Sequence, residues 1–125
     1  MRRLSVLLAF AFSAAPPVAS ADDIYHGLHG ADGALCCGHE DCIPTTYREQ
    51  GGDFEFLTRE GDWVRIPSGR ISFRFVPGDP PNDDSHHAHL CYRPSTEADR
   101  GSSYAPDHLF GPIWLRCAFI PPGGV

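Results

Sequence analysis

The sequence contains no lysine, so all ten of its basic residues are arginines, and the acidic residues outnumber them with 16. A chain with this excess of negative charge repels polyanions, which excludes nucleic acid as an expected partner. The same repulsion excludes binding to acidic lipid surfaces.

Several catalytic motifs are also missing. The sequence has no Gly-x-Ser-x-Gly elbow, no phosphate-binding loop, no dinucleotide-binding glycine pattern and no His-Glu-x-x-His helix. It has no Cys-x-x-Cys redox motif and no Asp-x-Asp-x-Asp-Gly calcium loop. Without any of these motifs, the sequence identifies no catalytic residue. Their absence does not address hydrolases with paired carboxylates, because only the fold brings such residues together.

What the sequence does have is an N-terminal export pattern. Arg2 and Arg3 precede an apolar stretch over residues 4–15, and the small residues Ala-Ser-Ala follow at 19–21. This order predicts a signal peptide, residues 1–21, that is removed after Ala21. The stretch is shorter than the ~20 residues that span a bilayer, and no second apolar run follows, so we expect no membrane span.

Residues 22–125 then form one small domain. Its 13 glycines and most of the 12 prolines disfavour long helices and favour turns between short strands. Alternating apolar residues predict a three-stranded meander over residues 53–76. Its expected core residues are Phe54, Phe56, Val64, Ile66, Ile71, Phe73 and Phe75.

Two further strands are expected at residues 87–92 and 113–120, separated by a polar loop over 94–108 that has room for a short helical turn. In the last strand, Ile113, Leu115, Cys117 and Phe119 are expected to share one face. The prolines of residues 77–85 predict a loop. The expected fold is therefore mainly β: a small barrel or rolled antiparallel sheet of about five strands, disulfide-stabilised, with an irregular N-terminal segment.

Five cysteines follow the predicted signal peptide: Cys36, Cys37, Cys42, Cys91 and Cys117. In an exported domain they are expected to form disulfides. We predict one bridge from Cys36 or Cys37 and one from Cys42, reaching Cys91 and Cys117, while the pairing itself stays open. Each would close a long loop and contribute about 4 kcal/mol in the chain-entropy treatment. The odd cysteine leaves a free thiol or a covalent dimer open.

Histidines offer an alternative role for the same region. His87 and His89 lie two apart on one expected strand face, and His39 lies between cysteines. Imidazole and thiolate ligands suit zinc or copper. Oxidised cysteines cannot ligate, so we expect only weak zinc or copper binding and no tight cofactor site.

The order of these motifs resembles a family of small exported alphaproteobacterial proteins. The segments that carry the resemblance are Cys-Cys-Gly-His-Glu-Asp-Cys at 36–42, His-Leu-Cys at 89–91 and Cys-Ala-Phe-Ile-Pro-Pro at 117–122. The family is uncharacterised, so the resemblance implies a periplasmic or secreted location and no activity.

The leading interpretation is therefore an exported, disulfide-stapled, non-catalytic domain that binds an unidentified envelope component or serves structurally. A periplasmic zinc or copper binding protein is the alternative, and a small secreted hydrolase is third.

Overall fold

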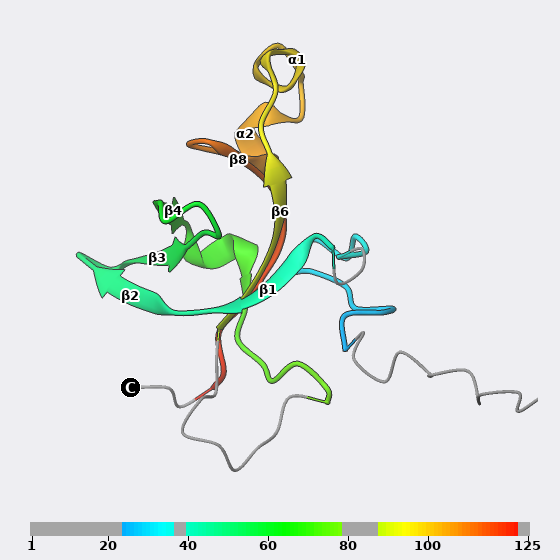
Figure 1. Ribbon diagram of the computed structural model, residues 1–125, viewed down its shortest axis with the longest axis vertical. Helices are drawn as coiled ribbons and strands as arrows, with labels where there is room; N and C mark the ends of the chain where they lie inside the picture. Colours follow the sequence, from blue (N-terminus) through cyan, green and yellow to red (C-terminus); the bar gives the residue numbers. More distant parts are fainter. Residues whose placement is uncertain (1–23, 37–39, 79–87, 123–125) are drawn as a thin grey trace, which may run out of the picture.

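Eight short strands form two sheets in the part of the chain that the structure describes, residues 24–36, 40–78 and 88–122 of a computed structural model (Figure 1). The strands are β1 (Cys42–Thr45), β2 (Tyr47–Gln50), β3 (Asp53–Leu57), β4 (Trp63–Ile66), β5 (Ile71–Ser72), β6 (Ala88–Pro94), β7 (Leu109–Phe110) and β8 (Ile113–Phe119).

The larger sheet has the order β1-β6-β8-β5, and β7 also pairs with β8. Its pairs are antiparallel except for β5 and β8, which run parallel. The smaller sheet is the antiparallel meander β2-β3-β4. This arrangement confirms the expected mainly β fold with its disulfides, although the two sheets do not close into a barrel.

The meander forms because its apolar residues alternate. Phe56 lies opposite Val64, and Phe54 lies opposite Ile66, so all four side chains point to one face. Charged residues occupy the other face, where Arg48 and Glu55 form an ion pair at 3.3 Å. The β2–β3 turn is Gly51-Gly52, with φ angles of 60° and 88° that glycine adopts without strain.

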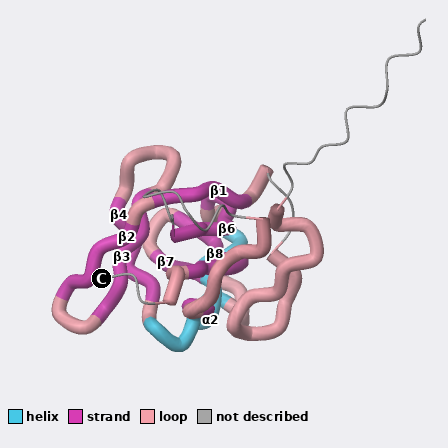
Figure 2. Tube along the Cα trace, turned by 90° about the horizontal axis from the view of Figure 1, so that it is seen from below, coloured by secondary structure: helices cyan, strands magenta, loops and turns pink. Residues whose placement is uncertain are grey.

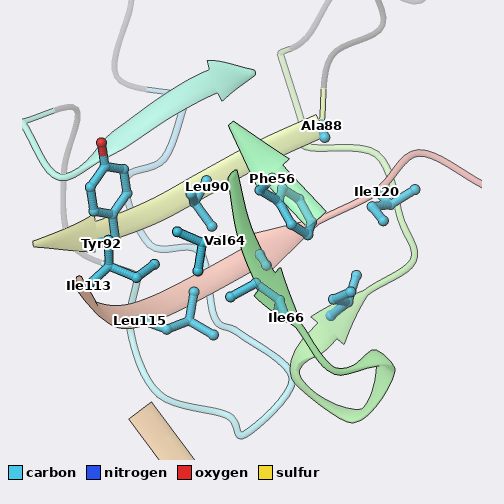
Figure 3. Packing of buried hydrophobic residues seen from close by; sticks show 11 residues of the cluster. Phe56, Val64, Ile66, Ala88, Leu90, Tyr92, Ile113, Leu115 and Ile120 are labelled. Atoms are coloured by element: carbon cyan, nitrogen blue, oxygen red, sulfur yellow. The ribbon is translucent and has the colours of Figure 1, made fainter. Parts of the chain in front are cut away.

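The main core lies between the two sheets (Figure 3). The inner face of the meander packs there against one face of β6 and β8. Eleven buried residues form this core: Phe56, Val64, Ile66, Ile71, Ala88, Leu90, Tyr92, Ile113, Leu115, Ala118 and Ile120.

A second core covers the opposite face of the larger sheet. It contains four cysteines together with Tyr25, Leu28, Val76 and Phe119. Figures 1 and 2 show the N-terminal segment, residues 24–36, on the side of β6 and β8 that faces away from the meander. The larger sheet is therefore buried on both faces, although the segment that covers the second face contains no strand longer than a single bridge.

A bulge in β8 lets that strand serve both cores. Cys91 pairs with Cys117, but the next residue of β6, Tyr92, pairs with Leu115, so Arg116 is the extra residue. Leu115 consequently faces the main core, whereas Cys117 faces the second core. The expectation that Ile113, Leu115, Cys117 and Phe119 share one face is therefore wrong, because the bulge reverses the alternation.

The predicted third strand of the meander is also wrong. A single 3-10 turn at Ser68–Arg70 redirects the chain, and Ile71 then joins β8 in the larger sheet. Phe73 and Phe75 are 48% and 51% exposed, so they are not core residues. Phe73 retains only an edge contact with Phe54, with ring centroids 5.6 Å apart.

The loop between β6 and β7 contains two single-turn helices, α1 (Glu97–Arg100) and α2 (Ala105–His108). They confirm the expected long polar loop with a short helical turn. The expected proline-rich loop falls mostly on residues 79–85, which lie outside the described part. Within the described part, no helix is long and apolar enough to cross a membrane.

Two phenylalanine substitutions test these core assignments. Phe56→Ala removes a fully buried ring and should lower the free energy of unfolding by about 3–5 kcal/mol. Phe73→Ala removes a half-exposed ring and should lower it by less than about 1 kcal/mol. Urea denaturation of both variants measures the two differences, and equal losses would contradict the placement of Phe73 outside the core.

Candidate functional site

The cysteines converge at one place on the larger sheet. Disulfides join Cys36 to Cys117 and Cys42 to Cys91. Because Cys91 and Cys117 are direct partners across β6 and β8, both bridges start from the same point of the sheet. One bridge thus bonds the N-terminal segment to β8, and the other bonds the start of β1 to β6. The sequence predicts that these cysteines reach Cys91 and Cys117, and the structure supplies the pairing.

Close packing accompanies the bridge from Cys36. The loop that precedes Cys36 folds back on itself through an isolated antiparallel β-bridge, in which His29 lies opposite Leu35, and it lies directly on β8. At Gly30, a Cβ atom would stand 2.9 Å from the Cys117 sulfur and 3.3 Å from the Arg116 carbonyl oxygen. Only glycine lets the loop approach this closely. Cys37 lies outside the described residues, so a free thiol or a covalent dimer through it stays a prediction.

Of the three predicted metal ligands, His39, His87 and His89, the described part of the chain contains only His89. His89 is buried, with 2% of its surface exposed, and its Nδ1 is 2.8 Å from the hydroxyl of Tyr25. This contact fastens the N-terminal segment to β6 beside the disulfides. His39 and His87 lie outside the described residues, and within the described part no three histidine, cysteine or acidic side chains are grouped to hold an ion. The position of His89 thus gives this residue a packing role.

A small cleft lies at the C-terminal end of β6. The turn between β3 and β4 forms one side, and the end of β6 with the start of β8 forms the other. The cleft measures about 160 Å³ and is lined by Glu60, Asp62, Tyr92, Pro94, Pro112 and Ile113. Figure 3 shows Tyr92 and Ile113 together at this end of the core.

Hydrogen bonds fix the wall of the cleft around Tyr92. The Tyr92 hydroxyl accepts the backbone N–H of Arg59 at 2.8 Å and donates to Glu60 Oε2 at 2.8 Å. The Arg59 guanidinium donates to the carbonyl oxygens of Glu40 and Cys42, which ties the turn to β1. The cleft is therefore built on hydrogen bonds that link three separate segments.

These contacts set the charges in the cleft. The hydrogen bond from Tyr92 lowers the pKa of Glu60, so its carboxyl group is ionised at neutral pH. Burial, together with the adjacent Glu60, raises the pKa of Tyr92, so its hydroxyl stays protonated. Both pKa values thus move away from neutrality, whereas general acid–base groups work best with a pKa near the operating pH.

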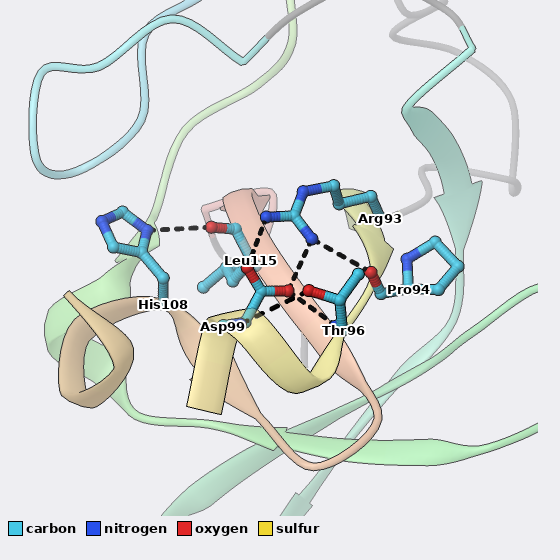
Figure 4. A network of polar contacts seen from close by, with 6 residues as sticks. All are labelled: Arg93, Pro94, Thr96, Asp99, His108 and Leu115. Carbon is cyan, nitrogen blue, oxygen red and sulfur yellow. Dashed lines mark hydrogen bonds and ion pairs between the residues drawn. The ribbon is translucent and has the colours of Figure 1, made fainter. Parts of the chain in front are cut away.

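A second polar network holds the loop beside the cleft (Figure 4). Arg93 makes two hydrogen bonds to the carboxylate of Asp99, at 2.7 and 2.8 Å. The same carboxylate accepts the backbone N–H of Thr96 in a capping box at the start of α1. Arg93 also lies over the ring of Trp114, 5.0 Å from its centroid.

His108 closes this loop against β8. Its ring stacks on Trp114 with centroids 5.0 Å apart, and its Nδ1 lies 3.0 Å from the carbonyl oxygen of Leu115. The shorter contact, to a carbonyl oxygen that only accepts, favours a proton on Nδ1 over the 3.4 Å approach of the Arg70 guanidinium, which only donates. The loop is thereby fixed to the strand that supplies one wall of the cleft.

No local pattern in the sequence identifies the cleft residues. They come from three segments that are separated by 18 or more positions along the chain, and tyrosine, proline and acidic residues are common surface types. The spacing of charges in Arg-Glu-Gly-Asp at 59–62 is unremarkable in a turn. Comparison of the chain with protein-family models, curated proteins and solved structures gives no match.

The Asp99 network predicts a pH-dependent contribution to stability. Hydrogen bonds from Arg93 and Thr96 lower the pKa of Asp99 far below its ordinary 3.8 in the folded state. A lowered folded-state pKa stabilises the fold above the unfolded-state pKa, and this contribution disappears as the pH falls through the folded-state value. Asp99→Asn should therefore be less stable than the wild type at neutral pH, with a difference that shrinks in acid.

Denaturant midpoints at pH values of about 7, 5 and 3 measure this difference. Asp107→Asn, at an exposed position on α2, controls for the removal of a surface carboxylate. A difference for Asp99→Asn that is the same at all three pH values would contradict the proposed role of its charge.

Proposed function

We propose that this chain is an exported, non-catalytic binding domain of the bacterial envelope that recognises another protein. The observation that carries the proposal is the preformed cleft at the end of β6. Hydrogen bonds fix its shape, and its apolar walls and acidic side chains suit contact with a partner surface. The disulfides hold the scaffold that presents it.

The location in this proposal has two supports. Two disulfides within one small chain indicate an oxidising environment outside the cytoplasm. The predicted signal peptide over residues 1–21 specifies export, and the resemblance to small alphaproteobacterial proteins favours the periplasm or the medium. We therefore propose that the domain is periplasmic or secreted.

The size of the cleft favours a partner protein over a small-molecule substrate. Sites for drug-sized ligands occupy ~300–1,000 Å³. The cleft of about 160 Å³ has room for a single long side chain. Pro94 and Pro112 stand exposed at its edge, where a partner surface would contact them. A binding module that takes one anchoring side chain fits these dimensions.

The two alternative functions have less support among the described residues. The predicted zinc or copper set includes His89, but this side chain is buried and contacts Tyr25. A hydrolase centred on the cleft would have to use Glu60 and Tyr92, but neither pKa is shifted toward neutrality: that of Glu60 is lowered and that of Tyr92 is raised. The binding domain is therefore the leading proposal.

Photocross-linking in intact cells tests the proposal. A photoreactive amino acid at Pro112, on the edge of the cleft, should yield one discrete adduct with another envelope protein, in which this chain begins at Asp22. The same amino acid at Glu49, on the exposed edge strand β2, is the matched control and should not yield that adduct. Mass spectrometry of the adduct identifies both chains.

Two results would contradict the proposal. Absence of a discrete adduct at Pro112, or an adduct that forms equally from Glu49, would argue against recognition at the cleft. A cross-linked chain that retains Met1 would refute export through the predicted signal peptide.

A further inference from the structure

The cleft combines apolar walls with an acidic edge. Pro94, Pro112 and Ile113 line one side together with the ring of Tyr92, while Glu60 and Asp62 stand on the turn opposite. Both acidic residues are exposed, whereas Tyr92 and Ile113 are each 2% exposed. A ligand group that fits this cleft is therefore apolar along its length and positively charged at its end.

The charges around the cleft leave its acidic edge available. Glu60 is ionised and uses one oxygen to accept the Tyr92 hydroxyl, which holds its carboxylate in place. Among the described residues, no cation forms an ion pair with the carboxylate of Asp62. Arg65, three positions further along the chain, pairs with Asp53 instead. A cation that enters the cleft would meet two carboxylates on one side.

The two arginines beside the cleft, Arg59 and Arg93, make their hydrogen bonds outside it, although the charge of Arg59 also helps to lower the pKa of Glu60. Arg59 lies 5.9 Å from the centre of the Tyr92 ring, but its guanidinium donates to the carbonyl oxygens of Glu40 and Cys42. Arg93 is held by Asp99. Neither arginine neutralises Asp62 by a direct contact.

We propose that the cleft binds a single lysine or arginine side chain of the partner protein. The aliphatic stem lies between Pro94, Pro112 and Ile113, and the charged head meets Glu60 and Asp62. Long basic side chains bury their stems on apolar surface in this way while the head stays among polar groups. This inference rests on the proposed binding function and specifies the chemistry of its anchor.

The composition of the whole chain supports the same partner. Once residues 1–21 are removed, eight arginines oppose 16 acidic residues, so the domain attracts positively charged surfaces. Such complementarity speeds encounter and selects among partners. The chain contains no lysine of its own, so a lysine anchor cannot come from a second copy of it.

Chemical shift mapping of the oxidised mature protein, residues 22–125, tests the inference with single-residue probes. The probes are the amides of Nα-acetyl-lysine, Nα-acetyl-arginine and Nα-acetyl-norleucine, where norleucine keeps the apolar stem without the charge. They are added up to roughly 20 mM, since one side chain is expected to bind no tighter than about millimolar. Lysine and arginine should shift the amide signals of residues 60–62, 92 and 113, and norleucine should shift them less.

A charge-neutral variant with its control isolates the acidic edge. Glu60→Gln with Asp62→Asn should weaken lysine and arginine binding about fivefold or more, because each exposed ion pair contributes up to about a factor of five. Glu49→Gln with Asp107→Asn removes two exposed carboxylates outside the cleft and should leave binding unchanged within about twofold. Dispersed amide spectra of both double variants show that they are folded.

The outcomes separate this inference from the proposed function. Equal shifts from norleucine and lysine, or undiminished lysine binding in the Glu60→Gln, Asp62→Asn variant, would overturn recognition of a cation and leave the cleft as an apolar binding site. Absence of cleft shifts with all three probes would overturn the inference as well. In either case a discrete adduct from the Pro112 cross-linker would still support the binding function, whereas its absence would remove both.

Discussion

Cys91 and Cys117 lie opposite each other on the neighbouring strands β6 and β8, and each forms a disulfide with a cysteine nearer the N-terminus. The arrangement of the other elements depends on these two adjacent bridges. Each of these cysteines bonds to the N-terminal segment or the start of β1, so two covalent links leave the sheet at one point. The bridges close loops of 49 and 81 residues, and loops of such length contribute about 4 kcal/mol each in the chain-entropy treatment. A segment with almost no regular structure can therefore cover one face of the larger sheet.

Because the N-terminal segment covers that face, the meander is left to cover the opposite face, and the cleft forms where the strands end. The meander covers the opposite face and buries the main core, so β6 and β8 are enclosed on both sides. The two strands continue past the covered region and, with the β3–β4 turn, form the cleft at their far end. The disulfides thus join the middle of the strand pair, and the cleft lies where the same strands end beside Pro94 and Ile113. The covalent links stabilise a rigid scaffold, and the strand ends present a preformed site, as recognition of a partner requires.

Much of this fold follows from local sequence patterns, and the rest depends on contacts between distant residues. Alternation identifies the buried faces of β3 and β4, and the cysteine positions predict which segments are bridged. Phe73 and Phe75 show the same alternation but lie outside the core, because Ile71 leaves the meander to pair with β8. No residue type in the sequence marks the bulge at Arg116, so the alternation pattern places Cys117 on the wrong face of β8. The cleft was not predictable because it joins residues from three segments, and the contact of His89 with Tyr25 joins residues 64 positions apart.

Hydrogen exchange after removal of one bridge measures whether the disulfide holds the N-terminal segment on the sheet. In a Cys36→Ala, Cys117→Ala variant, amide protection should be lost in residues 24–36, including the bond from Cys36 N–H to the Leu28 carbonyl. Protection of the meander over residues 47–66 should persist, since its hydrogen bonds lie in the other sheet. Undiminished protection of residues 24–36 in this variant would show that the segment is held without its disulfide, and that the bridge is not what fixes it.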